Sequence, residues 1–128
     1  MPSDLAEPSL ANDPQRARRY YAACMAASAG CGRGKDASNL DDEERARLRD
    51  QARQWLRAEV AAWGKKIDSA PAARESTEEA LKLWLTDPDL AGLREPELLD
   101  KLPVAEVRAC REMWHDINAQ IERTRRRN

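Results

Sequence analysis

The side chains best suited to chemistry in this chain are one histidine and three cysteines. His115 stands beside Asp116 and near Glu112, and these are the residue types of a general acid–base site. Neighbouring residues on a helix point apart, so His115 and Asp116 do not form a dyad on the helix predicted there. Cys24 and Cys110 fall on predicted core faces with no base beside them. We therefore expect no enzyme and assign no catalytic residue.

The sequence also gives little support for a metal site or a nucleotide-binding loop. Cys24, Cys31 and Cys110 include no CxxC pair, and a zinc site needs four good ligands that one histidine and scattered cysteines do not supply. The glycine-rich stretch 30–35 ends in Lys35, but it lacks the GxxxxGK[ST] spacing, and Asp36 replaces the serine or threonine of a phosphate loop. A glycine helix cap followed by a connection explains it better. We expect no metal, no cofactor and reduced thiols in a cytoplasmic protein.

Bulk charge argues against nucleic-acid and membrane surfaces as partners. The chain has 128 residues with 22 basic and 23 acidic side chains, a net charge of -1. It contains no apolar run long enough to span a membrane. The basic exceptions are Arg16, Arg18 and Arg19 near the start, and the arginine-rich tail from Arg123 to Arg127. Nucleic-acid binding through those two clusters is the alternative that we keep open, and it would weaken steeply with salt.

The stretch that must position everything else is a long amphipathic helix predicted over residues 42–63. Asp41 and Glu44 have capping-box spacing, and acidic residues fill the first turn, where the helix dipole favours them. Apolar residues then recur every three or four positions and form one stripe. Gly64 is expected to break or bend this helix after Trp63, with a last turn over 65–68 as the alternative. The stripe comprises Leu48, Ala52, Trp55, Leu56, Val60 and Trp63.

The rest of the chain reads as further helices, most of them begun by proline. We predict a frayed lead-in over 1–12 and one helical domain over 13–125, with helices at roughly 14–29, 42–63, 72–85, 96–101 and 103–125. No stretch alternates with period two, so the fold class is all-α, with about four main helices and two short helices that begin at proline. Four tryptophans and no phenylalanine make Trp55, Trp84 and Trp114 the expected meeting point of the core. The predicted core residues are Cys24, Leu48, Ala52, Trp55, Leu56, Leu81, Trp84, Val107, Trp114 and Ile117.

Two of these helices resemble a tetratricopeptide repeat. Tyr20, Ala23, Cys24 and Ala27 take the places of W-x2-L-G-x2-Y in the first helix of that repeat. Ala52-x3-Leu56 resembles the A-x3-F of its second helix. Residues 31–44 form an insertion for which a repeat of roughly 34 residues has no room. The resemblance implies a modified repeat.

A second resemblance covers most of the predicted domain. The stretches 20–37, 40–58 and 84–103 resemble the C-terminal end of tetratricopeptide-repeat regions in large bacterial proteins that begin with a eukaryotic-like serine/threonine kinase domain. The kinase motifs themselves are missing from this sequence, so no kinase activity is carried over. The chain is then a stand-alone relative, a truncated reading frame or a separately expressed piece.

These resemblances imply a non-catalytic interaction, capping or scaffold module. Helical repeats bury their faces on neighbours, so a short array caps itself, associates with a second copy or docks a protein partner. The candidates for a partner-facing surface are Arg16, Arg19, Tyr20 and Tyr21. The alternative for the two tyrosines is half-buried packing.

Overall fold

A computed structural model describes residues 14–33 and 39–125, with side chains from Arg18 onward. Within these ranges every regular element is a helix and none is a strand, so the all-α prediction is confirmed. None of the helices described has the length and apolar character needed to cross a membrane. The elements in chain order are α1 (Pro14–Gly30), α2 (Asp42–Ser69), η3 (Pro71–Ala73), α3 (Arg74–Trp84), η4 (Pro88–Leu93), α4 (Pro96–Leu99) and α5 (Val104–Arg125).

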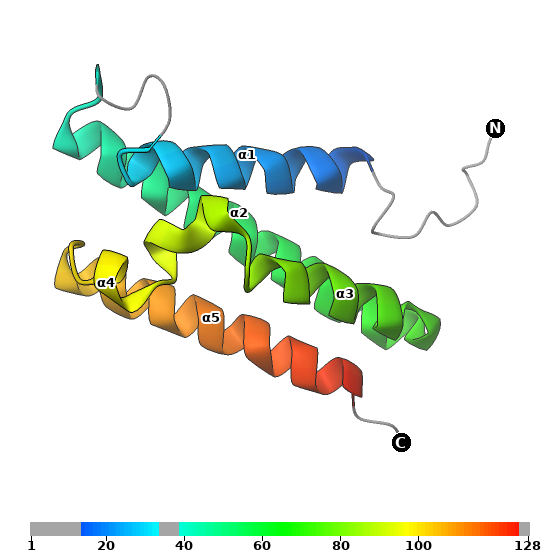
Figure 1. The fold of residues 1–128 in the computed structure, drawn as a ribbon. Helices are drawn as coiled ribbons and strands as arrows, with labels where there is room; N and C mark the ends of the chain where they lie inside the picture. The colour runs from blue at the N-terminus through cyan, green and yellow to red at the C-terminus, as the bar shows by residue number, and fades with distance from the viewer. Residues whose placement is uncertain (1–13, 34–38, 126–128) are drawn as a thin grey trace.

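Helix α2 forms the centre of the arrangement (Figure 1). It runs antiparallel to α1, packs on α1 along much of its length, and also contacts α3 and α5. Helices α3 and α5 pack on each other, and η4 lies against α1. The chain from η4 to α4 thereby connects the α1 side of α2 to the α5 side (Figure 1).

The end of α1 is a glycine cap. The Gly32 amide donates to the Ala29 carbonyl at 3.0 Å and the Arg33 amide to the Ser28 carbonyl at 2.9 Å, the two bonds of a Schellman motif. Gly32 has a φ of 78°, which favours glycine. Gly30 serves a different purpose, since a Cβ there would lie 2.9 Å from the Arg45 carbonyl oxygen. The two glycines therefore turn the chain and let α1 approach α2 closely.

The start of α2 is as predicted, but its end is not. The Glu44 amide donates to Asp41 at 2.8 Å, and the Asp41 amide donates to the Glu44 carboxylate at 3.0 Å, which completes the capping box. The helix then continues through Gly64 to Ser69, so the predicted break is wrong. Trp63 and Ile67, on either side of Gly64, are both buried. Their packing offsets the cost of a glycine in a helix, about 1 kcal/mol.

The later helices differ from their predicted ranges at the ends. The helix predicted over 72–85 is α3, preceded by the separate 3-10 turn η3. The predicted short helix at 96–101 is the four-residue α4, and the last long helix begins at Val104, after Pro103. Asp87 caps η4 and accepts a hydrogen bond from the Asp89 amide at 2.9 Å. Proline and aspartate thus mark the helix starts well, while the ends depend on packing.

The core lies where α1, α2, η4 and α5 meet, with α3 closing it. Most predicted core residues are buried there, namely Cys24, Ala52, Leu56, Leu81, Trp84, Trp114 and Ile117. Leu48, Trp55 and Val107 are only half-buried. Trp63 lies in the core cluster with Trp84 and Trp114, whereas Trp55 packs against its edge. The difference arises because Leu56, beside Trp55, takes the fully buried place on α2.

Candidate functional site

The four residues predicted to face a partner do not form one surface. The Arg19 guanidinium lies 3.0 Å from the Glu59 carboxylate, whose side chain is almost completely buried in α2. A buried carboxylate needs a compensating cation, and Arg19 supplies it while 34% of its side chain stays exposed. Arg16 lies in α1, but its side chain falls outside the described residues. A role of Arg19 in contacting a partner stays a prediction.

Tyr20 is half-buried and belongs to the packing of the fold, the alternative given for the two tyrosines. Its ring stacks on Trp84 with centroids 5.1 Å apart, and its hydroxyl donates to Asp87 at 2.6 Å. Burial, followed by the hydrogen bond to Asp87, raises the pKa of Tyr20, which keeps the hydroxyl protonated as a donor. Tyr20 thus ties α1 to α3 and to the start of η4.

The exposed face of α1 is centred on Tyr21 instead. Tyr21 is 64% exposed, and Met25, one turn later, is 41% exposed. Arg18, one turn before Tyr21, is exposed as well. We call Arg18, Tyr21 and Met25 the α1 outer face. It pairs an aromatic ring and a flexible thioether with one positive charge, a combination found in protein-binding surfaces.

Cys24, Asp87 and Asp89 offer three ligand atoms within 4.8 Å of one another, although the sequence predicted no metal. Hydrogen bonds already occupy this cluster. Asp87 accepts from Tyr20 and, at 3.6 Å, from the Cys24 thiol, while its other oxygen caps η4. Burial raises the pKa of Cys24 to about 12, which keeps the thiol as a donor rather than a thiolate ligand. The cluster serves as a hydrogen-bonded junction of α1 and η4.

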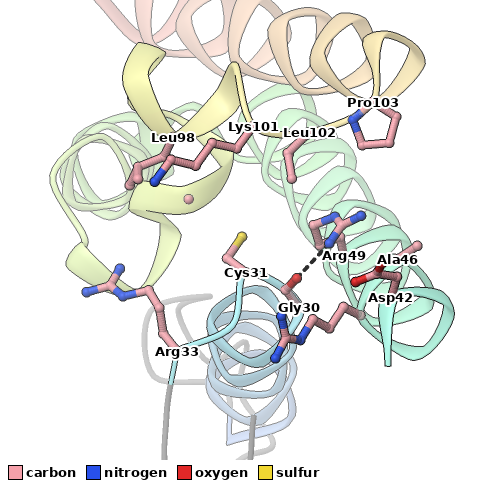
Figure 2. A pocket seen from close by; sticks show the side chains of 12 residues that line it. Gly30, Cys31, Arg33, Asp42, Ala46, Arg49, Leu98, Lys101, Leu102 and Pro103 are labelled. Atoms are coloured by element: carbon pink, nitrogen blue, oxygen red, sulfur yellow. Dashed lines mark hydrogen bonds between the residues drawn. The ribbon is translucent and has the colours of Figure 1, made fainter. Parts of the chain in front are cut away.

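A large cavity lies where α1 ends, α2 begins and α4 leads into α5. Its volume is about 710 Å³, and Figure 2 shows the side chains around it. We call it the basic cleft because its charged lining comprises four cations and one carboxylate. The lining residues are Gly30, Cys31, Arg33, Asp42, Arg45, Ala46, Arg49, Gly92, Leu98, Lys101, Leu102 and Pro103.

A buried ion-pair cluster forms one wall of the basic cleft. Arg49 donates through two nitrogens to both oxygens of Glu106 at 2.7 Å, and its third nitrogen donates to the Gly30 carbonyl at 2.7 Å. Arg53 adds a bond to the same carboxylate at 2.9 Å. Burial by itself would raise the pKa of Glu106, but the bonds from Arg49 and Arg53 outweigh it and hold that pKa below its usual range.

The tail arginines and the histidine occupy other places. Arg123 pairs with Asp68, and Arg125 lies 2.8 Å from Glu78 and 3.2 Å from Glu122. These acidic partners compensate the positive charge on which the nucleic-acid alternative depends. Arg126 and Arg127 lie outside the described residues. His115 is exposed on α5, in a shallow hollow with Arg57, Arg111, Glu112 and Asp116.

Sequence reasoning missed Met25 and the basic cleft. Met25 stands four residues after Tyr21, and this i,i+4 spacing was the signal for a shared exposed face. The cleft gave little signal, because its cations come from α2 and from two separate connections. Comparisons with known protein families, with curated proteins and with solved structures found no match for this chain.

Proposed function

We propose that this chain is a non-catalytic interaction and capping module that docks a protein through the α1 outer face. The observation that carries the proposal is the pair Tyr21 and Met25, one helical turn apart and open to solvent. The opposite side of α1 is built from small residues that pack closely on α2 and η4. A helix fixed along one side can present the other without rearranging, which lowers the entropy lost on binding.

The antiparallel pair of α1 and α2 supports a relationship to helical-repeat modules. Such repeats consist of paired antiparallel helices that stack on neighbouring pairs. Helix α2 has 28 residues and extends well beyond α1 (Figure 1). Its distal part is covered by α3 and α5. We therefore place the protein among modified, self-capping arrays, similar to the end of the repeat region in the kinase-linked proteins.

The test compares three forms of the purified chain. A Tyr21→Ser/Met25→Ser double variant removes the apolar part of the α1 outer face, and Leu83→Ser is a matched control, since Leu83 is 68% exposed on α3. Light scattering gives the solution mass of each form, and each form also serves as bait in a lysate of the source organism. We expect a dimer or a specific captured protein with the wild type and the control only. Association that survives the double variant, or no association with the wild type, would refute this docking face.

A further inference from the structure

We propose that the basic cleft binds the dianionic phosphate group of a phosphomonoester. This binding site is separate from the α1 outer face, because the two share no residue. Three features of the cleft favour such a ligand, namely the charge of the lining, the separation of that charge across the cleft, and the apolar surface beside it.

The lining carries more positive charge than its acidic groups compensate. Arg33, Arg45, Arg49 and Lys101 contribute four positive charges. Asp42 is the one carboxylate among these lining residues, and Arg49 is paired with Glu106. Arg33 and Lys101 form no ion pair with the described residues. A phosphomonoester carries close to two negative charges at pH 7, so these two cations would match the charge on the ligand.

The charges are also separated in space. Figure 2 shows Arg33 and Lys101 on one side of the cleft with Leu98, and Asp42 on the other side with Ala46 and Arg49. Arg49 uses all three guanidinium nitrogens on Glu106 and Gly30, so it forms a fixed wall. Arg33 is anchored through a single nitrogen, which donates to the Pro88 carbonyl at 2.7 Å. The side of Arg33 and Lys101 is the side that would receive an anion.

Arginine at this position favours an oxyanion over a point-like anion. Its planar guanidinium offers paired donors that match phosphate oxygens. The bond from Arg33 to Pro88 fixes the guanidinium near η4 and leaves its other nitrogens for a ligand. Lys101 then supplies a compact second charge from the connection between α4 and α5.

The apolar part of the lining distinguishes an ester from inorganic phosphate. Leu98, Leu102 and Pro103 line the cleft from the α4–α5 region, and Cys31 points into it from the end of α1 (Figure 2). Burying apolar surface of this kind against a ring or chain of the ligand contributes favourably to the binding free energy. A phosphate group with an organic substituent would therefore bind more tightly than free phosphate.

The first test is calorimetric titration of the full chain with phenyl phosphate, a small probe that has both features. We expect phenyl phosphate to bind more tightly than inorganic phosphate or phthalate, a dicarboxylate of similar size. Arg33→Gln and Lys101→Gln should each weaken binding about tenfold or more, the effect of losing a charge-assisted hydrogen bond. Lys82→Gln is the matched control, because Lys82 is exposed on α3 away from the cleft. It should leave the affinity unchanged.

Cys31 provides an independent report of where the probe binds. Cys24 and Cys110 are buried, whereas Cys31 is partly exposed and lines the cleft. Alkylation should therefore modify Cys31 first, and bound phenyl phosphate should slow that reaction at least severalfold. The protection should disappear in Arg33→Gln and persist in Lys82→Gln.

A phosphoserine peptide flanked by alanines identifies the natural source of the group. Tighter binding of the peptide would assign the phosphate to a modified protein, and tighter binding of phenyl phosphate would assign it to a small molecule. Either result supports a phosphomonoester site. Three results would overturn it: no binding of either probe, equal binding of phthalate, or binding that neither cleft variant weakens and that leaves Cys31 unprotected.

Discussion

Two of the arginine–carboxylate contacts that join α5 to α2 differ strongly in their exposure. At the start of α5, Glu106 meets Arg49 and Arg53 with side chains only 10–12% exposed. Further along the two helices, Asp116 of α5 lies 3.2 Å from Arg57 of α2, and their side chains are 54% and 42% exposed. At both places the arginine comes from α2 and the carboxylate from α5.

The difference shows that burial, rather than the presence of an ion pair, decides what such a contact does for the fold. In water the attraction between two charges is weak and is screened by salt, so an exposed pair contributes about 0–1 kcal/mol. In the interior the attraction is strong, but each ion has lost its hydration. Removing one partner there leaves a buried charge without compensation. The buried cluster is therefore sensitive to mutation, and the exposed pair is not.

The largest effect is expected for Glu106→Ala. This change leaves the buried Arg49 with no carboxylate and leaves Arg53 with only the exposed Asp50 at 3.5 Å. Loss of one partner of a buried ion pair typically costs about 3–5 kcal/mol of unfolding free energy. Urea denaturation followed by circular dichroism measures the loss. A loss below about 1 kcal/mol would mean that water or another group compensates the two arginines, and the contrast with Asp116 would then fail.

Lowering the pH should remove the stabilising effect of Glu106 in the wild type. The pKa of Glu106 is lowered in the folded protein, so its stabilising effect is complete above the ordinary value of 4.5 and is lost as the pH falls through the lowered pKa. The comparison is between wild type and Glu106→Gln, whose side chain stays neutral. Their difference in unfolding free energy should be constant near pH 7 and shrink below about pH 4.5. A difference that does not change with pH would contradict this assignment.

Tyr20→Phe gives an intermediate effect. It keeps the ring stacked on Trp84 but removes the hydroxyl that donates to Asp87. A hydrogen bond to a charged acceptor is worth about 1.5–3 kcal/mol, and Asp87 retains its bonds from Cys24 and from the Asp89 amide, so the lower end is expected. Thermal unfolding checks the loss, with Tyr21→Phe as the control on the exposed side of α1. Equal effects of the two changes would refute the inward placement of Tyr20.

The smallest effect is expected for Arg57→Gln. Its partner Asp116 is mostly exposed, so the loss should be about 0–1 kcal/mol and should decrease further in high salt. The measurement is the same urea titration at low and high ionic strength. A loss that approaches that of Glu106→Ala would show that exposure does not separate the two contacts.

More of the fold than of the candidate site could be predicted from the sequence. Capping at Asp41 and Glu44 and the proline starts are local signals, and they located the helix starts to within two residues. The sequence did not show that Arg19 pairs with the buried Glu59, because Glu59 lies 40 residues later. It left the packing of Tyr20 as an alternative only, because Trp84 and Asp87 are more distant still. Helical spacing marks neighbouring faces, but it does not show which face the rest of the chain will cover.

The sequence alone therefore determined that this protein is helical and where most of its helices begin, since those properties depend on residues within one or two turns. The tertiary structure decided that α2 continues through Gly64, because burial of Trp63 and Ile67 outweighs a local preference for a break. It also decided that Glu106 accepts hydrogen bonds from Arg49 and Arg53, and that Arg33 and Lys101 line the same cleft. These pairings join residues more than 50 positions apart, and only the folded arrangement of the helices brings them together.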